Sequence, residues 1–330
     1  MAKRIFALLL AAGLAISVCG CKLGPLELAL PEGLLETNDR QPAEETPQQQ
    51  PTEQTAPAEE PVNRRICAVS AGGWNSIGLR GDGNVVAAGR NQFGQCDVYG
   101  WKAVEKISAG DSHVVGLRSD GTVVAVGETK YGQCDVYGWH NVVDISAGTF
   151  CTLGVRSNGT VVVAGSKNED GQLNVYSWEN IVQVAAGEYH SVGLRSDGTV
   201  VATGRNNQGQ CQVSSWRDVV AVAAGVEHTI GLRADGTVLI TGNNEDGQCN
   251  TYGWSNLMAI SAGDYHTVGL RRDGTVVSCG RNDYGQCNIT GWTDVVAVDA
   301  GYAHTVGLRS DGSAMAVGRS EYGMCNVTGW

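Results

Sequence analysis

The sequence predicts an all-β domain built as a seven-bladed β-propeller, and three observations support this prediction. A unit of about 38 residues recurs seven times, up to the last residue of the chain. The 46 glycines and the many Val and Thr residues favour short strands and tight turns over helices. All seven prolines lie before the repeats, between Pro25 and Pro61, as expected because proline fits poorly into paired strands.

The N-terminal residues have the pattern of a bacterial lipoprotein signal peptide. Lys3 and Arg4 precede an apolar stretch, residues 5–18, that is too short for an ordinary membrane-spanning helix. The stretch ends in Val-Cys-Gly-Cys, which resembles a lipobox, and the small residue Gly20 places lipidation on Cys21. We therefore predict an extracytoplasmic, membrane-anchored lipoprotein of the cell envelope, with a plain secretory signal as the alternative.

A tether is predicted between the signal peptide and the repeats. From Lys22 to Asn63 the chain is rich in Pro, Gln, Glu and Thr, and nine acidic residues face only two basic ones. Such a segment cannot bury enough apolar surface to offset the entropy of ordering it, so it should be disordered. The predicted organisation is a signal peptide at 1–21, a disordered tether at 22–63 and a propeller at 64–330.

The fifth copy illustrates the strands expected in each unit. Apolar runs at 219–224, 228–233 and 237–241 predict three strands, and the Asp235-Gly236 turn joins the last two as a hairpin. A short fourth strand is expected through Gln248 and beyond. Four antiparallel strands in each unit, without a long crossover helix, indicate a propeller. A straight solenoid is the alternative, but it needs distinct capping repeats, so we expect the two ends of the array to meet and close a ring.

The repeat motif resembles that of a known family. The pattern AG-x-x-H-T-V-G-L-R-x-D-G-T-V, followed by G-x-N-x-x-G-Q, is similar to the RCC1 (regulator of chromosome condensation) repeat. The resemblance covers all seven copies and implies a seven-bladed propeller. Six copies carry Cys where that family usually has Leu, and only Leu173 keeps the usual residue. The Y-G-W endings look like those of secreted bacterial members.

Symmetry separates structural residues from candidate functional ones, because chemistry happens once per molecule. Five repeated histidines are expected to hydrogen-bond neighbouring backbone and to hold no metal: His113, His190, His228, His266 and His304. The repeated cysteines should be small buried hydrophobes without disulfides: Cys96, Cys134, Cys211, Cys249, Cys287 and Cys325. The repeated tryptophans should pack between blades: Trp101, Trp139, Trp178, Trp216, Trp254, Trp292 and Trp330.

Positions that vary between copies are free to serve a partner. They fall in the loop between the first two strands and in the loop before Gly-Gln, which should emerge on the same face, with the uniform Asp-Gly turns opposite. Exposed aromatic residues among polar groups are typical of recognition surfaces. The candidate partner-binding residues are Trp74, Asp111, Phe150, Glu188, Tyr189, Glu227, Asp264, Tyr265 and Tyr302. Alternatively, these loop tips are solvated and under no constraint.

Several classes of function are excluded or disfavoured by the sequence. No singular cluster of nucleophile and base occurs, so we predict no enzyme, and we predict no metal or cofactor either. The repeat domain holds 25 acids against 19 bases, which disfavours nucleic acid. The hypothesis that remains is a monomeric scaffold that binds a protein partner with a basic patch. An inhibitor of a secreted enzyme, similar to a bacterial β-lactamase inhibitor of like repeats, and a glycan-binding module are the alternatives.

Overall fold

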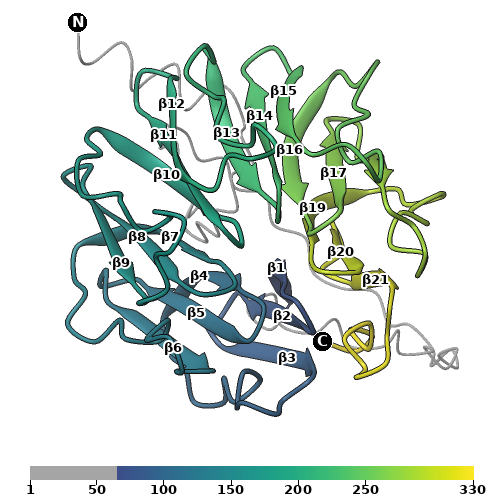
Figure 1. The fold of residues 1–330 in the computed structure, drawn as a ribbon. Helices are drawn as coiled ribbons and strands as arrows, with labels where there is room; N and C mark the ends of the chain where they lie inside the picture. Colours follow the sequence, from purple (N-terminus) through teal and green to yellow (C-terminus); the bar gives the residue numbers. More distant parts are fainter. Residues whose placement is uncertain (1–64) are drawn as a thin grey trace, which may run out of the picture.

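The computed structural model describes residues 65–330, so the predictions for the signal peptide, Cys21 and the tether lie outside the described residues. The described chain folds into seven antiparallel three-stranded sheets, arranged around a central axis as the blades of a propeller (Figure 1). The predicted fold is thus confirmed. Residues 65–330 contain no helix with the length and apolar character that a membrane crossing requires.

Each blade is formed by three strands that follow one another in the chain. From the first blade to the seventh, the strands are β1 (Ile66–Ala71), β2 (Asn75–Arg80) and β3 (Val85–Gly89); β4 (Val104–Ala109), β5 (His113–Arg118) and β6 (Val123–Gly127); β7 (Val142–Ala147), β8 (Thr152–Arg156) and β9 (Val161–Ala164); β10 (Ile181–Ala186), β11 (His190–Arg195) and β12 (Val200–Gly204); β13 (Val219–Ala224), β14 (His228–Arg233) and β15 (Val238–Gly242); β16 (Leu257–Ala262), β17 (His266–Arg271) and β18 (Val276–Gly280); and β19 (Val295–Ala300), β20 (His304–Arg309) and β21 (Ala314–Gly318).

The Asp-Gly turn forms the hairpin between the second and third strands, as predicted. In the fifth blade, Leu232 pairs with Val238, and Gly236 between them has a φ of 81°, which favours glycine. The Asp235 carboxylate accepts hydrogen bonds from the Thr237 amide at 2.9 Å and from its hydroxyl at 2.6 Å. Six blades carry Asp in this place and the third carries Asn158, which makes the same contacts.

The prediction of a fourth strand in each blade was wrong. The chain after β15 coils into successive turns, because side chains take the hydrogen bonds that a neighbouring strand would provide. Asn244 Oδ1 accepts from the Cys249 amide at 2.8 Å, and Gln248 Oε1 accepts from the Asp246 amide at 3.0 Å. Gly247 between them has a φ of 82°. The Asn and Gly-Gln residues of the repeat therefore specify a compact loop.

The repeated tryptophans pack between blades, as predicted. Each lies over the glycine at the middle of the second strand of the next blade. A methyl group on Gly116 would lie 2.7 Å from the Trp101 ring, so only glycine leaves room for the indole. Trp330 lies in the same way over Gly78 of the first blade, and the C-terminus lies beside that blade (Figure 1). The two ends of the repeat array therefore meet, and the ring is closed.

The repeated histidines are structural, but their partners differ from the prediction. His113 Nε2 lies 2.9 Å from the hydroxyl of Thr152 in the next blade, whereas we expected a backbone partner. The Thr152 hydroxyl itself donates to the Gln133 carbonyl at 2.7 Å, so the Nε2 proton of His113 is the donor. The other four repeated histidines make the same contact with Ser or Thr in the following blade. Burial lowers the pKa of His113 to about 4, and the ring is neutral at pH 7.

The repeated cysteines are less buried than the sequence predicts. All six are half-buried free thiols. The Cys96 thiol lies 3.3 Å from the Arg90 carbonyl, within the compact loop, and this contact keeps it near the surface. Burial raises the pKa of the Cys96 thiol to about 11, so the thiolate is disfavoured at neutral pH.

The first strand of each blade lines an axial cavity, where serine hydroxyls link neighbouring blades. Ser70 Oγ accepts from the Ala109 amide at 3.1 Å, and the same contact recurs between several blades. At the closing seam the seventh blade carries Asp299 in place of serine. Its carboxylate accepts from the Ala71 amide at 2.9 Å and from the hydroxyls of Ser70 at 3.0 Å and Ser261 at 2.6 Å. One carboxylate thus connects the sixth, seventh and first blades.

Candidate functional site

The two sets of variable loops lie on one face of the ring, as predicted, and we call this the variable-loop face. It comprises the loops between the first and second strands and the loops after the third strands. Rings from the two sets touch: the Trp74 and Tyr322 centroids lie 5.5 Å apart, and those of Tyr131 and Phe150 lie 5.2 Å apart. The Asp-Gly turns lie at the other ends of the same strands. Variation between repeats is therefore gathered on one surface.

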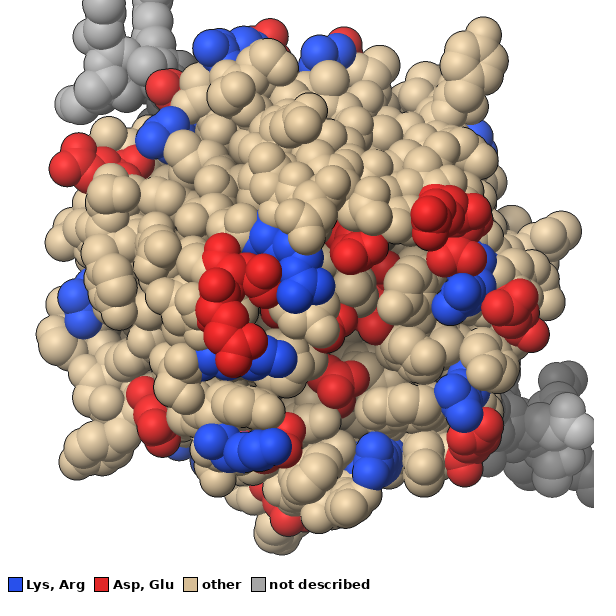
Figure 2. Space-filling view, viewed as in Figure 1, with Lys and Arg blue, Asp and Glu red and all other residues tan. Residues whose placement is uncertain are grey.

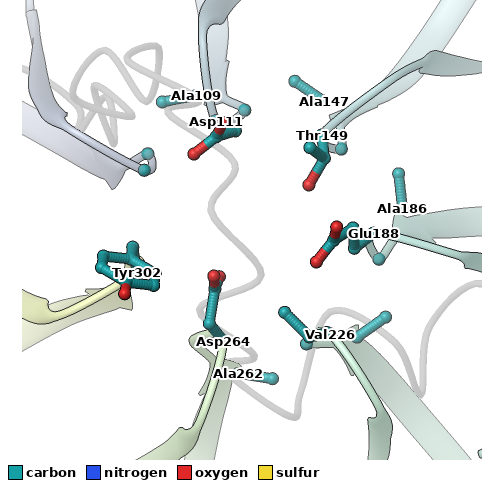
Figure 3. Close-up of a pocket in the computed structure, with 18 of the residues that line it drawn as sticks. Ala109, Asp111, Ala147, Thr149, Ala186, Glu188, Val226, Ala262, Asp264 and Tyr302 are labelled. Atoms are coloured by element: carbon teal, nitrogen blue, oxygen red, sulfur yellow. The ribbon is translucent and has the colours of Figure 1, made fainter.

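The first variable residue of each blade lies beside the axis, and in six blades it carries a side chain (Figure 3). Together these residues form a hollow of about 80 Å³, which we call the axial mouth. Its residues, one from each blade, are Gly73, Asp111, Thr149, Glu188, Val226, Asp264 and Tyr302. Because the seven positions converge on one axis, differences between repeats create a single asymmetric site.

Three carboxylates reach the axial mouth from alternate blades (Figure 3). Asp111 accepts a hydrogen bond from the Ser112 hydroxyl at 3.3 Å, and Glu188 has a hydrogen bond with Tyr189. Desolvation raises the pKa of both acids. Asp264 has no side-chain hydrogen bond among residues 65–330, and desolvation together with the charges of Asp111 and Glu188 raises its pKa to about 8.

The second variable residue of each blade lies further from the axis, and several are aromatic. They form two arcs with aromatic residues of the neighbouring loops. One arc contains Tyr131, Phe150 and Tyr189, with centroids 5.2 and 6.2 Å apart. The other arc contains Tyr265, Tyr302, Trp74 and Tyr322, with centroids 6.4, 5.1 and 5.5 Å apart. We call these sets the aromatic arcs.

Basic side chains stack on the aromatic arcs. Lys167 Nζ lies 3.6 Å from the Phe150 ring centroid, and Arg205 Cζ lies 3.7 Å from that of Tyr189. Arg281 and Arg319 lie 4.7 Å from the Tyr265 and Trp74 rings, respectively. These cations were not predicted from the sequence. A signal was present, since four copies place Arg directly after the glycine that ends the third strand: Arg90, Arg205, Arg281 and Arg319.

Carboxylates of the loops after the third strands hold two of these arginines. Asp170 pairs with Arg205 through two contacts, at 2.9 and 3.1 Å, and Asp246 pairs with Arg281 at 3.1 Å. A bidentate pair fixes the plane of a guanidinium as well as its position. The space-filling view shows acidic groups around a hollow near the middle of the molecule, with basic groups beside them (Figure 2). Charge on this surface is therefore mixed.

The nine predicted partner-binding residues all lie on the variable-loop face, but in different surroundings. Asp111, Glu188, Asp264 and Tyr302 line the axial mouth. Trp74, Phe150, Tyr189 and Tyr265 belong to the aromatic arcs. Glu227 belongs to neither set, and its carboxylate accepts a hydrogen bond from Asn243 at 3.1 Å. The aromatic residues are half-buried by mutual contact, whereas we expected them to be exposed.

The site offers contact area and charge, and the described part of the chain offers no metal centre. Residues 65–330 contain no group of three or more His, Cys, Asp or Glu side chains that could hold a metal ion. The raised pKa values at the axial mouth have a common origin in desolvation and like charge. Such an arrangement can bind a cationic group, since a positive charge would relieve both effects.

A family comparison agrees with the repeat pattern. The model of the "Regulator of chromosome condensation (RCC1) repeat" matches residues 66–95, 104–133, 181–210, 219–248, 259–286 and 295–323, more than half of the chain. The chain belongs to the RCC1 repeat family. The third blade lies outside the RCC1 matches, and it departs most from the pattern: Cys151 replaces histidine, and the loop before Gly171 is one residue longer. That longer loop carries Lys167.

Several solved structures share the fold. Prp20p from Saccharomyces cerevisiae matches with a TM-score of 0.56 and 21% identity, over 66% of this chain and 72% of that one. The ectodomain of the Arabidopsis thaliana receptor kinase ACR4 matches with a TM-score of 0.61 and 20% identity, over 77% and 97%. Human WBSCR16 matches with a TM-score of 0.60 and 18% identity, over 75% and 87%. No curated protein sequence matches the chain.

Proposed function

We propose that this RCC1-repeat protein is a cell-envelope lipoprotein whose propeller is a non-enzymatic, monomeric scaffold that binds a protein partner through the variable-loop face. The observation that carries the proposal is the grouping of the aromatic arcs, their stacked cations and the axial mouth on one face. Every seam between blades, by contrast, repeats the same few contacts. Residues that differ from blade to blade are thus gathered where a partner could touch them together.

The composition and order of this face fit protein recognition. Trp, Tyr and Arg are the residue types that most often dominate binding energy at protein interfaces. Here the rings are held by each other and the Arg205 guanidinium is held by Asp170, so little side-chain entropy would be lost on binding. Prp20p is described as binding Gsp1p and histones, so a propeller of similar fold serves as a protein-binding module.

The glycan-binding and inhibitor alternatives differ in what they require of the same face. A glycan would stack on open aromatic faces, but Lys167 and Arg205 already lie over Phe150 and Tyr189. We therefore favour a protein ligand. An inhibitor of a secreted enzyme would be a special case of protein binding, in which the bound partner is an enzyme that loses activity.

Alanine substitutions on the variable-loop face test the proposal. After a partner has been captured from envelope extract by the full-length protein, Trp74→Ala, Tyr189→Ala and Tyr265→Ala should each weaken its binding by about 2 kcal/mol, since truncating an anchor at an interface typically costs this much. Dissociation constants can be measured by surface plasmon resonance.

The matched control is Asp235→Asn in an Asp-Gly turn, which should leave binding unchanged. Thermal unfolding should show that all four variants remain folded. If the turn-face variant weakened binding and the three aromatic variants did not, the assignment of the face would be wrong.

The anchor is tested separately, because Cys21 lies outside the described residues. Metabolic labelling with radioactive palmitate should mark the wild-type protein, and Cys21→Ala should abolish the label and release or misprocess the protein. Cys19→Ala is the control and should keep the label. Persistent labelling of the Cys21→Ala variant would exclude lipidation at this residue.

A further inference from the structure

We propose that the axial mouth binds a single basic side chain, a lysine ammonium or an arginine guanidinium, that projects from the protein partner. This inference rests on the proposed function and specifies the chemistry at the centre of its binding face. It also narrows the predicted partner, because the sequence alone pointed to a basic patch.

The arrangement of the axial mouth suits one cation on the axis. The second, fourth and sixth blades supply Asp111, Glu188 and Asp264, whose carboxylates point inwards (Figure 3). Thr149, Val226 and Tyr302 stand between them on the third, fifth and seventh blades. The first blade has Gly73, and the Asp111 carboxylate packs against it, since a Cβ on Gly73 would lie 1.8 Å from Asp111 Oδ1. A hollow of about 80 Å³ is smaller than the usual range for small-molecule sites, and it has room for the end of one side chain rather than for a larger ligand.

Asp264 provides a second observation, which concerns hydrogen bonding as well as charge. Its carboxylate points into the axial mouth, yet no donor among residues 65–330 reaches it. Its neighbours at the mouth are two further acids and the rings of Tyr265 and Tyr302. Asp264 is half-buried, so an ionised carboxylate here has no protein donor and no counter-charge but keeps some contact with water. Its free energy is therefore higher than that of a fully hydrated carboxylate until a partner supplies a donor and a positive charge. An ammonium or guanidinium group would supply both at once.

The cations of the chain itself are held away from this position. Lys167 lies over Phe150, Arg205 lies between Tyr189 and Asp170, and Arg281 is paired with Asp246. The charges of Lys167 and Arg205 lower the pKa of Glu188, but desolvation outweighs them. The axial mouth is thus an acidic centre inside a ring of stacked cations.

This charge pattern restricts the partner. A broad basic patch would place positive groups against Arg205, Arg281 and Arg319, and like charges across an interface are unfavourable. One protruding Lys or Arg would match the acidic axial mouth. Apolar or acidic residues around it on the partner would match the surrounding ring of stacked cations. The inference therefore commits to an isolated basic residue on the partner.

A small probe tests the axial mouth without knowledge of the partner. The intact protein would be labelled with ¹³C at its Asp and Glu carboxyl carbons, and the pH midpoint of Asp264 would be measured by NMR with and without about 50 mM n-butylammonium chloride, a mimic of the lysine side chain. A site with a dissociation constant of about 1 mM would be nearly saturated. We expect the midpoint to fall by one pH unit or more, because the bound cation favours the ionised form.

Sodium chloride at equal concentration and neutral n-butanol are the controls, and neither should move the midpoint to the same extent. For the same reason the probe should bind more tightly at pH 8 than at pH 6, by up to tenfold for each unit below the midpoint. An unchanged midpoint, or one that sodium chloride lowers equally, would overturn the inference.

Variants then separate this inference from the proposed function. Asp264→Asn and Glu188→Gln should weaken n-butylammonium binding at least tenfold, as followed by the carboxyl resonance of Asp111, and Asp235→Asn should not. If a captured partner depends on Trp74 and Tyr189 but binds Asp264→Asn normally, the inference fails and the proposed function stands. If substitutions on the variable-loop face leave partner binding unchanged, the proposed function fails. The n-butylammonium measurement still tests the axial mouth in that case.

Discussion

The seams between blades and the variable-loop face are built from the same repeat, yet they use it in opposite ways. At each seam an indole lies over a glycine of the next blade, as Trp101 does over Gly116. At the axial mouth seven equivalent positions carry Gly, Asp, Thr, Glu, Val, Asp and Tyr. A contact repeated at every seam stabilises the ring, whereas a position that converges on the axis produces one site. Stability and recognition are therefore separable in this molecule, and the predictions below test that separation.

The largest effect is expected from removing a whole seam. Deletion of residues 293–330 removes the seventh blade together with Trp330, and so exposes Gly78 and the apolar residues that pack at the closing seam, among them Ile66 and Val69. Exposed apolar surface of this kind favours association. The six-blade variant should aggregate or fail to unfold cooperatively, as judged by size-exclusion chromatography and thermal melts. A monomeric, cooperatively unfolding variant would contradict closure by seam packing.

A single tryptophan should contribute much of the stability of one seam between blades. Trp101→Ala removes a ring that is only 8% exposed and packs in a core cluster with Val104, and loss of a buried aromatic typically costs about 3–5 kcal/mol. Tyr99→Ala, two residues earlier in the same loop, is the matched control, because Tyr99 is 100% exposed and its loss should cost under about 0.5 kcal/mol. Urea unfolding gives both free energies. Equal losses would show that the seam tryptophans are not structural.

Asp299 should matter because it replaces serine at the closing seam. Asp299→Ala leaves the Ala71 amide and the hydroxyls of Ser70 and Ser261 without their acceptor, which should lower the free energy of unfolding by about 2 kcal/mol. Asp299→Ser restores the residue type of other seams and should recover part of the loss. Urea unfolding again measures the difference. A serine variant less stable than the alanine variant would contradict this role.

The smallest effect is expected at the variable-loop face, and it should be stabilising. The pKa of Asp264 is raised to about 8 in the fold from an ordinary value of 3.8. An acid with a raised pKa favours the neutral form in the folded state, so stability falls as the pH rises from about 4 to about 8. Asp264→Asn removes this loss. At pH 9 the variant should be more stable than the wild type by about 1 kcal/mol, or a few degrees in Tm. At pH 5 the difference in stability between the two proteins should be smaller.

The exposed turn residue provides the opposite case. Hydrogen bonds from Thr237 lower the pKa of Asp235, so the ionised carboxylate stabilises the fold at high pH. The Asp235→Asn variant lacks this contribution and should therefore be less stable than the wild type at pH 9. Thermal unfolding at pH 5 and pH 9 checks both variants. A benefit of Asp264→Asn that is equal at the two pH values would rule out titration as its cause.

Prediction from the sequence succeeded where the repeat itself supplied the constraint. The Gly spacing and the Asp-Gly turns predicted seven units, antiparallel hairpins and a closed ring, because each of these follows from local turn chemistry and from the number of copies. The fourth strand failed for a related reason: Asn244 and Gln248 form side-chain to backbone hydrogen bonds that compete with strand pairing. The pattern of hydrophobic residues alone cannot predict that competition.

The candidate site was predicted in its residues but not in its organisation. Sequence variation singled out Trp74, Asp111 and Asp264 without showing that two of them line one cavity while the third belongs to an aromatic arc. Arg205 and Lys167 were overlooked because each lies in the loop after the third strand, whereas the ring it covers lies before the second strand of the same blade. Contacts of that kind depend on the pairing of the second and third strands, which brings these loops together.

By itself, the sequence determined the repeat, its turns, the family and the face on which variation is gathered, because these depend on spacing along the chain. Only the tertiary structure decided that Asp264 lies unpaired between Asp111 and Glu188, and that a ring of stacked cations surrounds them. Closing the ring brings residues from alternate blades to a single axis, where desolvation and like charge act on them together. The charge of the axial mouth is therefore a property of the closed ring, which no single repeat contains.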